Sequence, residues 1–257
     1  MKPTKQQKII AKKLLDYGKK LRQGENWVGP TDFTYKCPFA FLLGVIFDQG
    51  ITAEKAWDAP EILKKRLGTL DPVKIEKMNL RKIRKAIKGE RKGEALHRYI
   101  NKMARWIKDA ARIVSNEYSG NAKNIWEEAY TAREVMARLE EFPGISQKKA
   151  TMATRILEDI HKLDLSYWKD VDVSYDIHVR RVLWRTGIAT NDSYEEVINA
   201  ARALNPSYPG ELDEPAWVIG REWCDSRHPI CDEDNEYNPC PLSKVCPRFT
   251  RRKPDYQ

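Results

Sequence analysis

The stretch Leu139-Glu140-Glu141-Phe142-Pro143-Gly144-Ile145-Ser146-Gln147-Lys148-Lys149-Ala150-Thr151-Met152-Ala153 predicts two helices joined by a tight hairpin. Pro143 cannot continue the helix that arrives through Met136 and Leu139, because its ring removes the amide hydrogen that a helix interior requires. Gly144 can adopt the positive φ that a sharp reversal of the chain demands. The hairpin is therefore predicted at residues 143–146, in a pattern that ordinary αα-hairpins share.

A second helix is predicted to begin after Ser146, whose hydroxyl is expected to cap it. Apolar residues recur at helical spacing at Ala150, Ala153, Ile156 and Leu157. The backbone amides of residues 145–149 would then lie unpaired at a helix N-terminus, which attracts anions and above all phosphate. We therefore expect the hairpin to bind a phosphate backbone through Gly144, Ile145, Ser146 and Lys149.

The composition describes a folded, basic protein. Of its 257 residues, 41% are hydrophobic and 32% are charged, which suits one large or two modest domains. The 46 Lys plus Arg exceed the 37 Asp plus Glu, and the net charge of +9 favours a polyanionic partner. No apolar run reaches membrane-spanning length, and residues 1–8 lack the apolar core of a signal peptide. We therefore expect an intracellular monomer with no membrane partner.

Two other stretches stand out along the chain. Residues 38–49 form a dense apolar run that is too short to span a membrane, so a buried central helix is predicted there. Residues 81–92 carry seven basic side chains against the single acid Glu90. Both a solvated helix face and a contact with phosphates are consistent with that basic run.

The cysteines indicate a metal or cluster site. Cys224, Cys231, Cys240 and Cys246 follow the spacing C-x6-C-x8-C-x5-C, whereas Cys37 stands alone as a small hydrophobe. In a reducing compartment these four are poor candidates for a disulfide framework. Four thiolates bind either zinc or an iron–sulfur cluster, and paired C-x2-C ligands would have favoured zinc.

The hairpin, a later Asp segment and the cysteines together resemble the endonuclease III-like DNA glycosylases. The hairpin resembles the helix-hairpin-helix of that family, and Tyr175-Asp176-Ile177-His178-Val179-Arg180-Arg181-Val182 resembles its Asp-x-His segment. Gly220-Arg221-Glu222-Trp223-Cys224 resembles the approach to the first cluster cysteine. The resemblance spans residues 38–247 and departs from the family at Ser146, which is usually Gly, and in a longer connection at residues 162–174.

This resemblance implies an all-α fold of two helical lobes with a DNA-binding cleft between them. The six-helix domain with the helix-hairpin-helix would cover residues 31–159, and residues 1–30 would join 160–257 to form the domain with the cluster loop. The first and last cysteine gaps match the family's [4Fe-4S] loop, so an iron–sulfur cluster is favoured over zinc.

The resemblance also implies site residues. Lys148 takes the position of the lysine that attacks C1′ of the damaged nucleotide in bifunctional members, and Asp176 that of the carboxylate, besides being a helix N-cap. Arg227 and His228 lie in the loop that meets the DNA backbone. Gln49 is the candidate to fill the space left by an extruded base. Two aromatic residues of the longer connection, Tyr167 and Trp168, are candidates to stack on that base.

The predicted function is excision of a damaged or mispaired base from double-stranded DNA by base flipping, with β-elimination at the abasic site. Two alternatives remain open on the sequence. The first is a monofunctional glycosylase in which Lys148 does not reach the sugar. The second is a DNA-binding protein that keeps the hairpin and cluster as a scaffold without chemistry. The identity of the base is not encoded in any motif described above.

Overall fold

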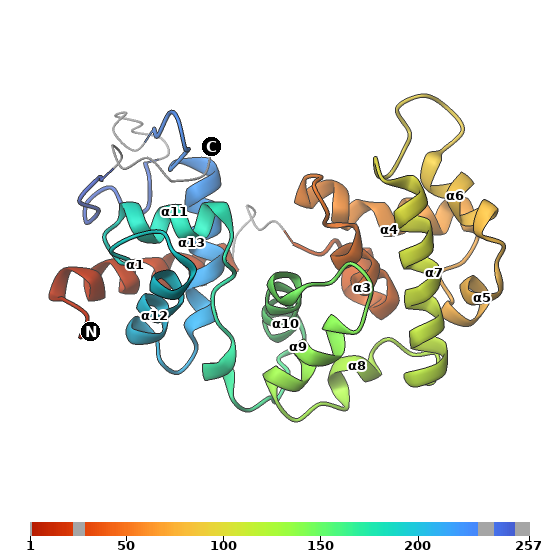
Figure 1. The fold of residues 1–257 in the computed structure, drawn as a ribbon, viewed down its shortest axis with the longest axis horizontal. Coiled ribbons are helices and arrows are strands. Elements are labelled where there is room, and N and C mark those ends of the chain that lie inside the picture. The colour runs from red at the N-terminus through yellow and green to blue at the C-terminus, as the bar shows by residue number, and fades with distance from the viewer. Residues whose placement is uncertain (1, 23–28, 231–238, 250–257) are drawn as a thin grey trace. The chain divides into compact units, whose positions relative to one another are not determined.

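The computed structural model describes residues 2–22, 29–230 and 239–249, with the backbone alone at 160 and 161 (Figure 1). Regular structure in these ranges is helical, with no β-strand, so the predicted all-α fold is confirmed. Contacts divide the chain into two compact units, one of residues 28–165 and one of residues 1–27 with 166–257. No helix in the described ranges is both long and apolar enough to cross a membrane.

The unit of residues 28–165 contains the helices from α2 to α10. They are α2 (Asp32–Lys36), α3 (Pro38–Phe47), α4 (Ala53–Leu67), α5 (Pro72–Lys77), α6 (Leu80–Lys88), α7 (Ile100–Glu117), α8 (Asn124–Glu127), α9 (Ala132–Glu140) and α10 (Gln147–His161).

Helix α3 is the centre of this unit, as its apolar sequence predicts. Every residue from Phe39 to Phe47 is buried. The ring of Phe41 lies 5.5 Å from that of Trp57 on α4 and 5.7 Å from that of Trp126 on α8. Gly44 is needed where α4 crosses, because a Cβ there would overlap the Trp57 ring. Packing on all sides fixes the end of α3 at Phe47, and with it the polar turn of residues 48–50.

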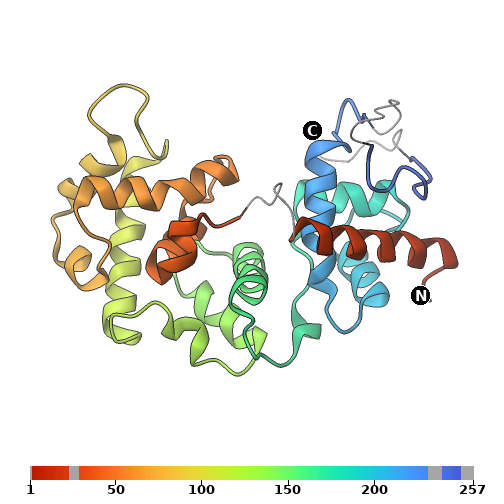
Figure 2. The same ribbon diagram turned by 180° about the vertical axis from the view of Figure 1, so that it is seen from behind.

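Helix α7 is a long helix of the same unit, and it packs against α5 and α6, as Figures 1 and 2 show. Its buried side is a stripe at helical spacing that includes Met103, Ile107 and Val114. At the edge of this stripe, Lys108 donates a hydrogen bond of 2.6 Å from Nζ to the carbonyl oxygen of Met78, the C-cap residue of α5.

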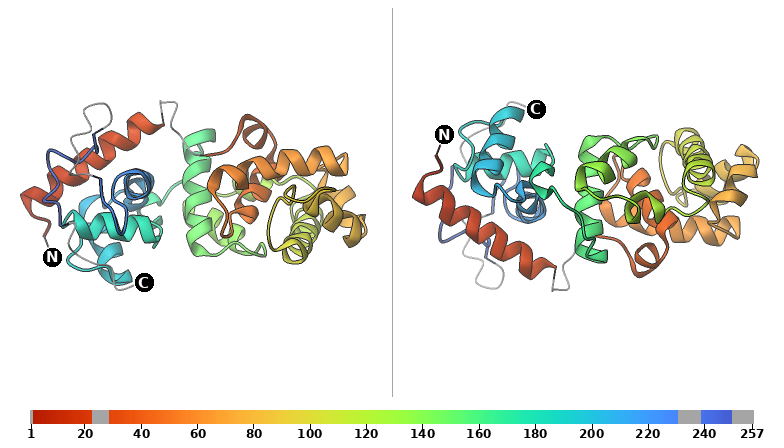
Figure 3. Two further views of the ribbon diagram at one scale, coloured as in Figure 1. Left: turned by 90° about the horizontal axis from the view of Figure 1, so that it is seen from above. Right: turned by 90° about the horizontal axis from the view of Figure 1, so that it is seen from below.

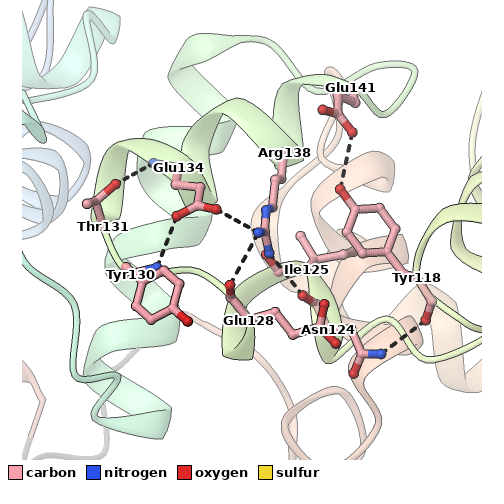
Figure 4. Close-up of polar contacts among 9 residues, drawn as sticks. All are labelled: Tyr118, Asn124, Ile125, Glu128, Tyr130, Thr131, Glu134, Arg138 and Glu141. Atoms are coloured by element: carbon pink, nitrogen blue, oxygen red, sulfur yellow. Dashed lines mark hydrogen bonds and ion pairs between the residues drawn. The ribbon is translucent and has the colours of Figure 1, made fainter.

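Arg138 of α9 fixes the first helix of the hairpin to α8. Its Nη1 donates to the carbonyl oxygens of Asn124 and Ile125, both at 3.2 Å. Its Nη2 donates to the carbonyl oxygen of Glu128 at 3.2 Å and to the Glu134 carboxylate at 2.6 Å, as Figure 4 shows. One guanidinium thereby joins α9 to three carbonyl oxygens of α8 and its C-cap residue.

The other unit contains α1 (Lys5–Leu21), η1 (Trp168–Asp170), α11 (Ile177–Arg185), α12 (Tyr194–Leu204), η2 (Pro209–Leu212) and α13 (Asp213–Glu222). Helix α13 packs against both α11 and α1 (Figure 3). The approach of α13 to α11 requires Gly220, because a Cβ there would lie 2.8 Å from the carbonyl oxygen of His178. Ile10, Leu14, Val182 and Ile219 belong to its core, which is closed by Cys240 and Leu242.

Candidate functional site

The hairpin between α9 and α10 has the predicted form, with one departure at Ser146. Gly144 has φ of +86°, and a Cβ on it would overlap the Trp106 ring of α7. The amide of Ile145 donates to the carbonyl oxygen of Phe142 at 3.1 Å, so that amide is used inside the turn. Ser146 has φ of −99° and makes no side-chain capping bond, contrary to the expected cap. A left-handed conformation is thus required at Gly144, and serine at 146 causes no backbone strain.

Two adjacent lysines on the first turn of α10 have opposite environments. Lys148 is exposed, whereas Lys149 is 7% exposed. Nζ of Lys149 donates a hydrogen bond of 3.2 Å to the carbonyl oxygen of Ile46 in the last turn of α3. The sequence predicts Lys149 at a phosphate-binding surface, but the structure places its side chain in the interior. Ile145 is also buried, at 6% exposed.

The buried amine of Lys149 has a perturbed pKa. Burial lowers its pKa from the ordinary value of 10.5 to about 8, and the neighbouring ammonium groups of Lys148 and Lys102 act in the same direction. The carboxylate of Asp48 opposes them by favouring the charged form. Desolvation is the largest of these effects, so the amine is still mostly protonated at neutral pH and loses its proton as the pH rises through about 8.

The turn that follows α3 is held from a second side by His97. Nε2 of His97 lies 2.9 Å from the carbonyl oxygen of Gln49, and the amide of Tyr99 donates to Nδ1 at 3.0 Å. Nδ1 must therefore accept, so Nε2 carries the proton and donates to Gln49. His97 is buried, and desolvation lowers its pKa, which favours this neutral form. Gln49 itself is half-buried on a turn that is fixed at both ends.

Asp176 is the N-cap of α11, as predicted from the sequence. Its carboxylate accepts a hydrogen bond of 2.8 Å from the amide of His178, and the residue is 8% exposed. His178 contacts Nη2 of Arg181 through Nδ1 at 2.9 Å and packs edge-on against Trp217. These contacts make His178 part of the packing between α11 and α13.

The segment that leads to Asp176 is fixed at three successive points. The amide of Gly210 donates to the carbonyl oxygen of Val171 at 2.7 Å. Asp172 accepts two hydrogen bonds of 2.7 Å from the guanidinium of Arg202. The amide of Ser174 donates to the buried carboxylate of Asp213 at 2.7 Å. Residues 171–174, which we name the 171–174 clamp, therefore place the Asp176 carboxylate by contacts with α12, η2 and α13.

The two aromatic residues of the longer connection precede this clamp and have different environments. The Trp168 ring lies 4.9 Å from the Tyr208 ring, so it packs within its own unit. Tyr167 is 56% exposed and adopts φ of +62°, an uncommon conformation for a bulky residue. Nζ of Lys169 lies 5.2 Å from the centre of the Tyr167 ring.

Three of the four clustered cysteines line one cavity with Arg185, Thr186 and Leu242; they are Cys224, Cys240 and Cys246. Cys231 lies outside the described residues. Two N–H groups point at the sulfur atoms: Nη1 of Arg185 is 3.7 Å from Sγ of Cys224, and the amide of Arg248 is 3.3 Å from Sγ of Cys246. Within residues 2–22, 29–230 and 239–249, no three His, Cys, Asp or Glu side chains converge tightly enough to hold a metal ion.

The loop after Cys224 is ordered around one carboxylate. Asp225 accepts hydrogen bonds from the amides of Arg227 and His228 at 2.8 and 2.9 Å, and these bonds lower the pKa of Asp225. Arg185 donates to the carbonyl oxygens of Asp225 and Ser226 at 2.6 and 2.8 Å. The side chains of Arg227 and His228 are exposed on this ordered loop.

The sequence-predicted residues are divided between the two units. Gln49, Gly144, Ser146 and Lys148 belong to the unit of residues 28–165, whereas Asp176 and the clustered cysteines belong to the other. The residues that sequence reasoning missed are His97 and the buried role of Lys149. A signal existed for Lys149, because it shares the helical stripe of Ala153 and Ile156, which predicts burial.

Comparisons with known proteins agree with this architecture. The family described as the HhH-GPD superfamily base excision DNA repair protein matches residues 43–206. An endonuclease III from Sulfolobus acidocaldarius is 25% identical over 200 residues, which cover 76% of this chain and 78% of that protein. A thermostable thymine-DNA glycosylase has a similar fold, with a TM-score of 0.63 and 16% identity over 96% of this chain and 98% of that one.

These matches define the class as a helical DNA-repair enzyme of the helix-hairpin-helix type. The chain belongs to the HhH-GPD superfamily of base excision DNA repair proteins. It is accordingly a base excision repair DNA glycosylase whose substrate is DNA. The resemblance drawn from the hairpin and the Asp segment is confirmed at the level of the superfamily.

Proposed function

We propose that the protein is a bifunctional glycosylase: it removes a damaged or mispaired base from double-stranded DNA and then nicks the abasic strand through Lys148. The observation that carries this proposal is the exposed amine of Lys148 on the first turn of α10, directly after the hairpin built on Gly144. Its position in the hairpin is that of the lysine in the bifunctional endonuclease III-like enzymes. An N-terminal helix turn also attracts the phosphates that flank a nucleotide.

The proposed chemistry uses one amine and one carboxylate. The amine of Lys148 forms a bond to C1′ while the bond from C1′ to the base breaks, and the base leaves with the proton that the attacking nitrogen loses. Asp176 stabilises the positive charge that develops on the sugar and accepts a proton from the attacking nitrogen. The sugar ring opens to a Schiff base, a proton leaves C2′, and the 3′ phosphate departs by β-elimination.

Asp176 is suited to this role by the way it is held. Its N-cap bond to the amide of His178 and the 171–174 clamp fix the carboxylate before substrate arrives. A preorganised group stabilises developing charge without the cost of reorganising at the moment of reaction. Arg202, through its two bonds to Asp172, acts on this carboxylate only through the backbone.

We further propose that the four clustered cysteines hold a [4Fe-4S] cluster. Support comes from three of them lining one cavity and from the N–H groups directed at Cys224 and Cys246, since such donors stabilise thiolates. Thiolate ligands also suit zinc, and metal analysis of the purified protein separates iron from zinc. The bound group would supply structural support for the loop that carries Arg227 and His228.

Borohydride trapping tests the proposed reaction. The purified protein is incubated with end-labelled duplexes that contain an abasic site, uracil, thymine glycol or 8-oxoguanine, and reductant is added. We expect a covalent protein–DNA band that disappears in Lys148→Ala and weakens in Asp176→Asn. Lys162→Ala, at the other end of the same helix, is the control that should retain it.

The outcomes separate the alternatives. A band that survives in Lys148→Ala would show that another amine is the nucleophile. Release of the free base with no band on any duplex would indicate a monofunctional glycosylase. Binding to the duplexes with neither band nor released base would indicate a DNA-binding protein without chemistry.

A further inference from the structure

Lys149 is a buried ionisable group that the proposed chemistry does not use. It lies next to Lys148 in sequence, but its ammonium points away from solvent and donates to the Ile46 carbonyl oxygen at 3.2 Å. The last four carbonyls of a helix have no partner within the helix, and they carry the negative end of its dipole. A cation at this end of α3 therefore supplies a donor to a terminal carbonyl and interacts favourably with the helix dipole.

Two contacts from different segments thus fix the turn of residues 48–50. Lys149 holds the last turn of α3 from the side of α10, and His97 holds the carbonyl of Gln49 from the segment before α7. Gly50 continues the turn with φ of +67°. The turn that presents Gln49 is consequently joined to the helix turn that presents Lys148 by one buried hydrogen bond.

The buried charge of Lys149 carries a cost in stability, because its environment disfavours the protonated amine. Desolvation of its amine opposes the charged form, and the ammonium groups of Lys148 and Lys102 add repulsion; the Asp48 carboxylate offsets these effects only in part. The same stripe of α10 continues with the buried apolar residues Ala153 and Ile156, so Lys149 is a charged residue beside apolar neighbours on its own helix. A costly buried charge beside a site is a pattern that points to function.

We infer that Lys149 is a positioning residue for the glycosylase: its hydrogen bond to Ile46 fixes the position of the turn that carries Gln49 relative to Lys148 on α10. The inference rests on the proposed function, because it assigns Gln49 and Lys148 to the extruded nucleotide. It extends that function to a residue which touches neither the sugar nor the base.

The charge of Lys149 makes this link sensitive to pH. The ionisable groups around it are Asp48 after α3, Lys102 on α7, Lys148 on α10 and His97 in the segment before α7. An ammonium donates a stronger hydrogen bond than a neutral amine does. Loss of its proton as the pH rises through about 8 weakens the tie to Ile46. The geometry of the turn should therefore loosen in mildly alkaline solution.

The test compares Lys149→Met and Lys149→Arg with wild type in the full-length protein. The readout is the ratio of affinities for a duplex containing a tetrahydrofuran abasic analogue and for the same duplex undamaged, with melting temperatures as a check on folding. This ratio reports how well the site holds an extruded nucleotide and involves no chemistry. Lys108→Met is the matched control, because it also removes a lysine–carbonyl bond, from Nζ to Met78, elsewhere in the same unit.

We expect Lys149→Met to reduce the ratio about tenfold, the equivalent of one charge-assisted hydrogen bond, and Lys108→Met to leave it unchanged. Wild type should lose preference for the abasic analogue between pH 7 and pH 9. Lys149→Arg, whose guanidinium stays charged, should keep its preference constant over that range.

Two results would overturn the inference. One is a folded Lys149→Met with the wild-type ratio. The other, decisive if the methionine variant does not fold, is a Lys149→Arg profile that falls with pH as the wild type's does. A wild type without any preference for the abasic analogue would reject the proposed function as well. If Lys149→Met shows a reduced affinity ratio but the wild type forms no covalent band in borohydride trapping, the lyase activity alone is rejected and the positioning role is kept.

Discussion

Replacing Lys149 by methionine should change how the free energy of unfolding depends on pH. The pKa of Lys149 is lowered to about 8 in the folded protein and is 10.5 for an ordinary lysine. At pH values between these two pKa values, the unfolded chain binds more protons than the folded one, so the free energy of unfolding rises with pH. From pH 7 to pH 9.5, this linkage stabilises wild type by about 2 kcal/mol relative to Lys149→Met.

Urea unfolding at the two pH values, followed by circular dichroism, measures this difference. Lys149→Arg should behave as Lys149→Met does, because neither side chain loses a proton in this range, so the pair separates titration from packing. All other lysines and tyrosines are common to the three proteins and cancel. A stability difference between wild type and Lys149→Met that stays constant, or that falls as the pH rises, would refute the assignment of a desolvated amine at this position.

Three further results are expected. Gly144→Ala should lower the free energy of unfolding by about 2 to 4 kcal/mol in urea titrations, because alanine there combines a positive φ with overlap on the Trp106 ring. Arg138→Ala should cost about 1 to 3 kcal/mol by the same measurement, since it leaves carbonyls at the end of α8 without their donor, whereas Glu134→Gln should cost less than about 1 kcal/mol. Cys240→Ser should reduce bound iron in elemental analysis and weaken binding to undamaged duplex DNA, whereas Cys37→Ser should keep both at the wild-type level.

The parts of the fold that could be predicted from the sequence are those fixed by local chemistry. Pro143 and Gly144 have few conformations to choose from, so the hairpin follows from the two residues alone. The apolar run at residues 38–49 predicts a helix buried on every side, and every residue of α3 from Phe39 to Phe47 is buried. Asp176 before an apolar helix pattern predicts an N-cap, and the structure contains that bond.

The parts that could not be predicted depend on contacts between distant segments. Nothing near Lys149 indicates that the carbonyl of Ile46 will be its partner, because 103 residues separate them. The role of His97 likewise depends on where the turn after α3 comes to lie. The residue type of Ser146 predicts a cap on α10, but a cap also depends on the rotamer, which the residue type does not specify. The fourth cysteine, Cys231, is outside the described residues, so its part in the cluster stays a prediction.

The 171–174 clamp has a consequence for variation among related chains. Residues 162–170 connect α10 to the clamp and belong to the connection of residues 162–174, which is longer than the resemblance leads one to expect. Because Val171, Asp172 and Ser174 are each bonded to the body of their own unit, additions upstream do not move the start of α11. Insertions and deletions in residues 162–170 can therefore accumulate without displacing the Asp176 carboxylate within its own unit, and the surface they build, including Tyr167, can diverge while that carboxylate stays in place.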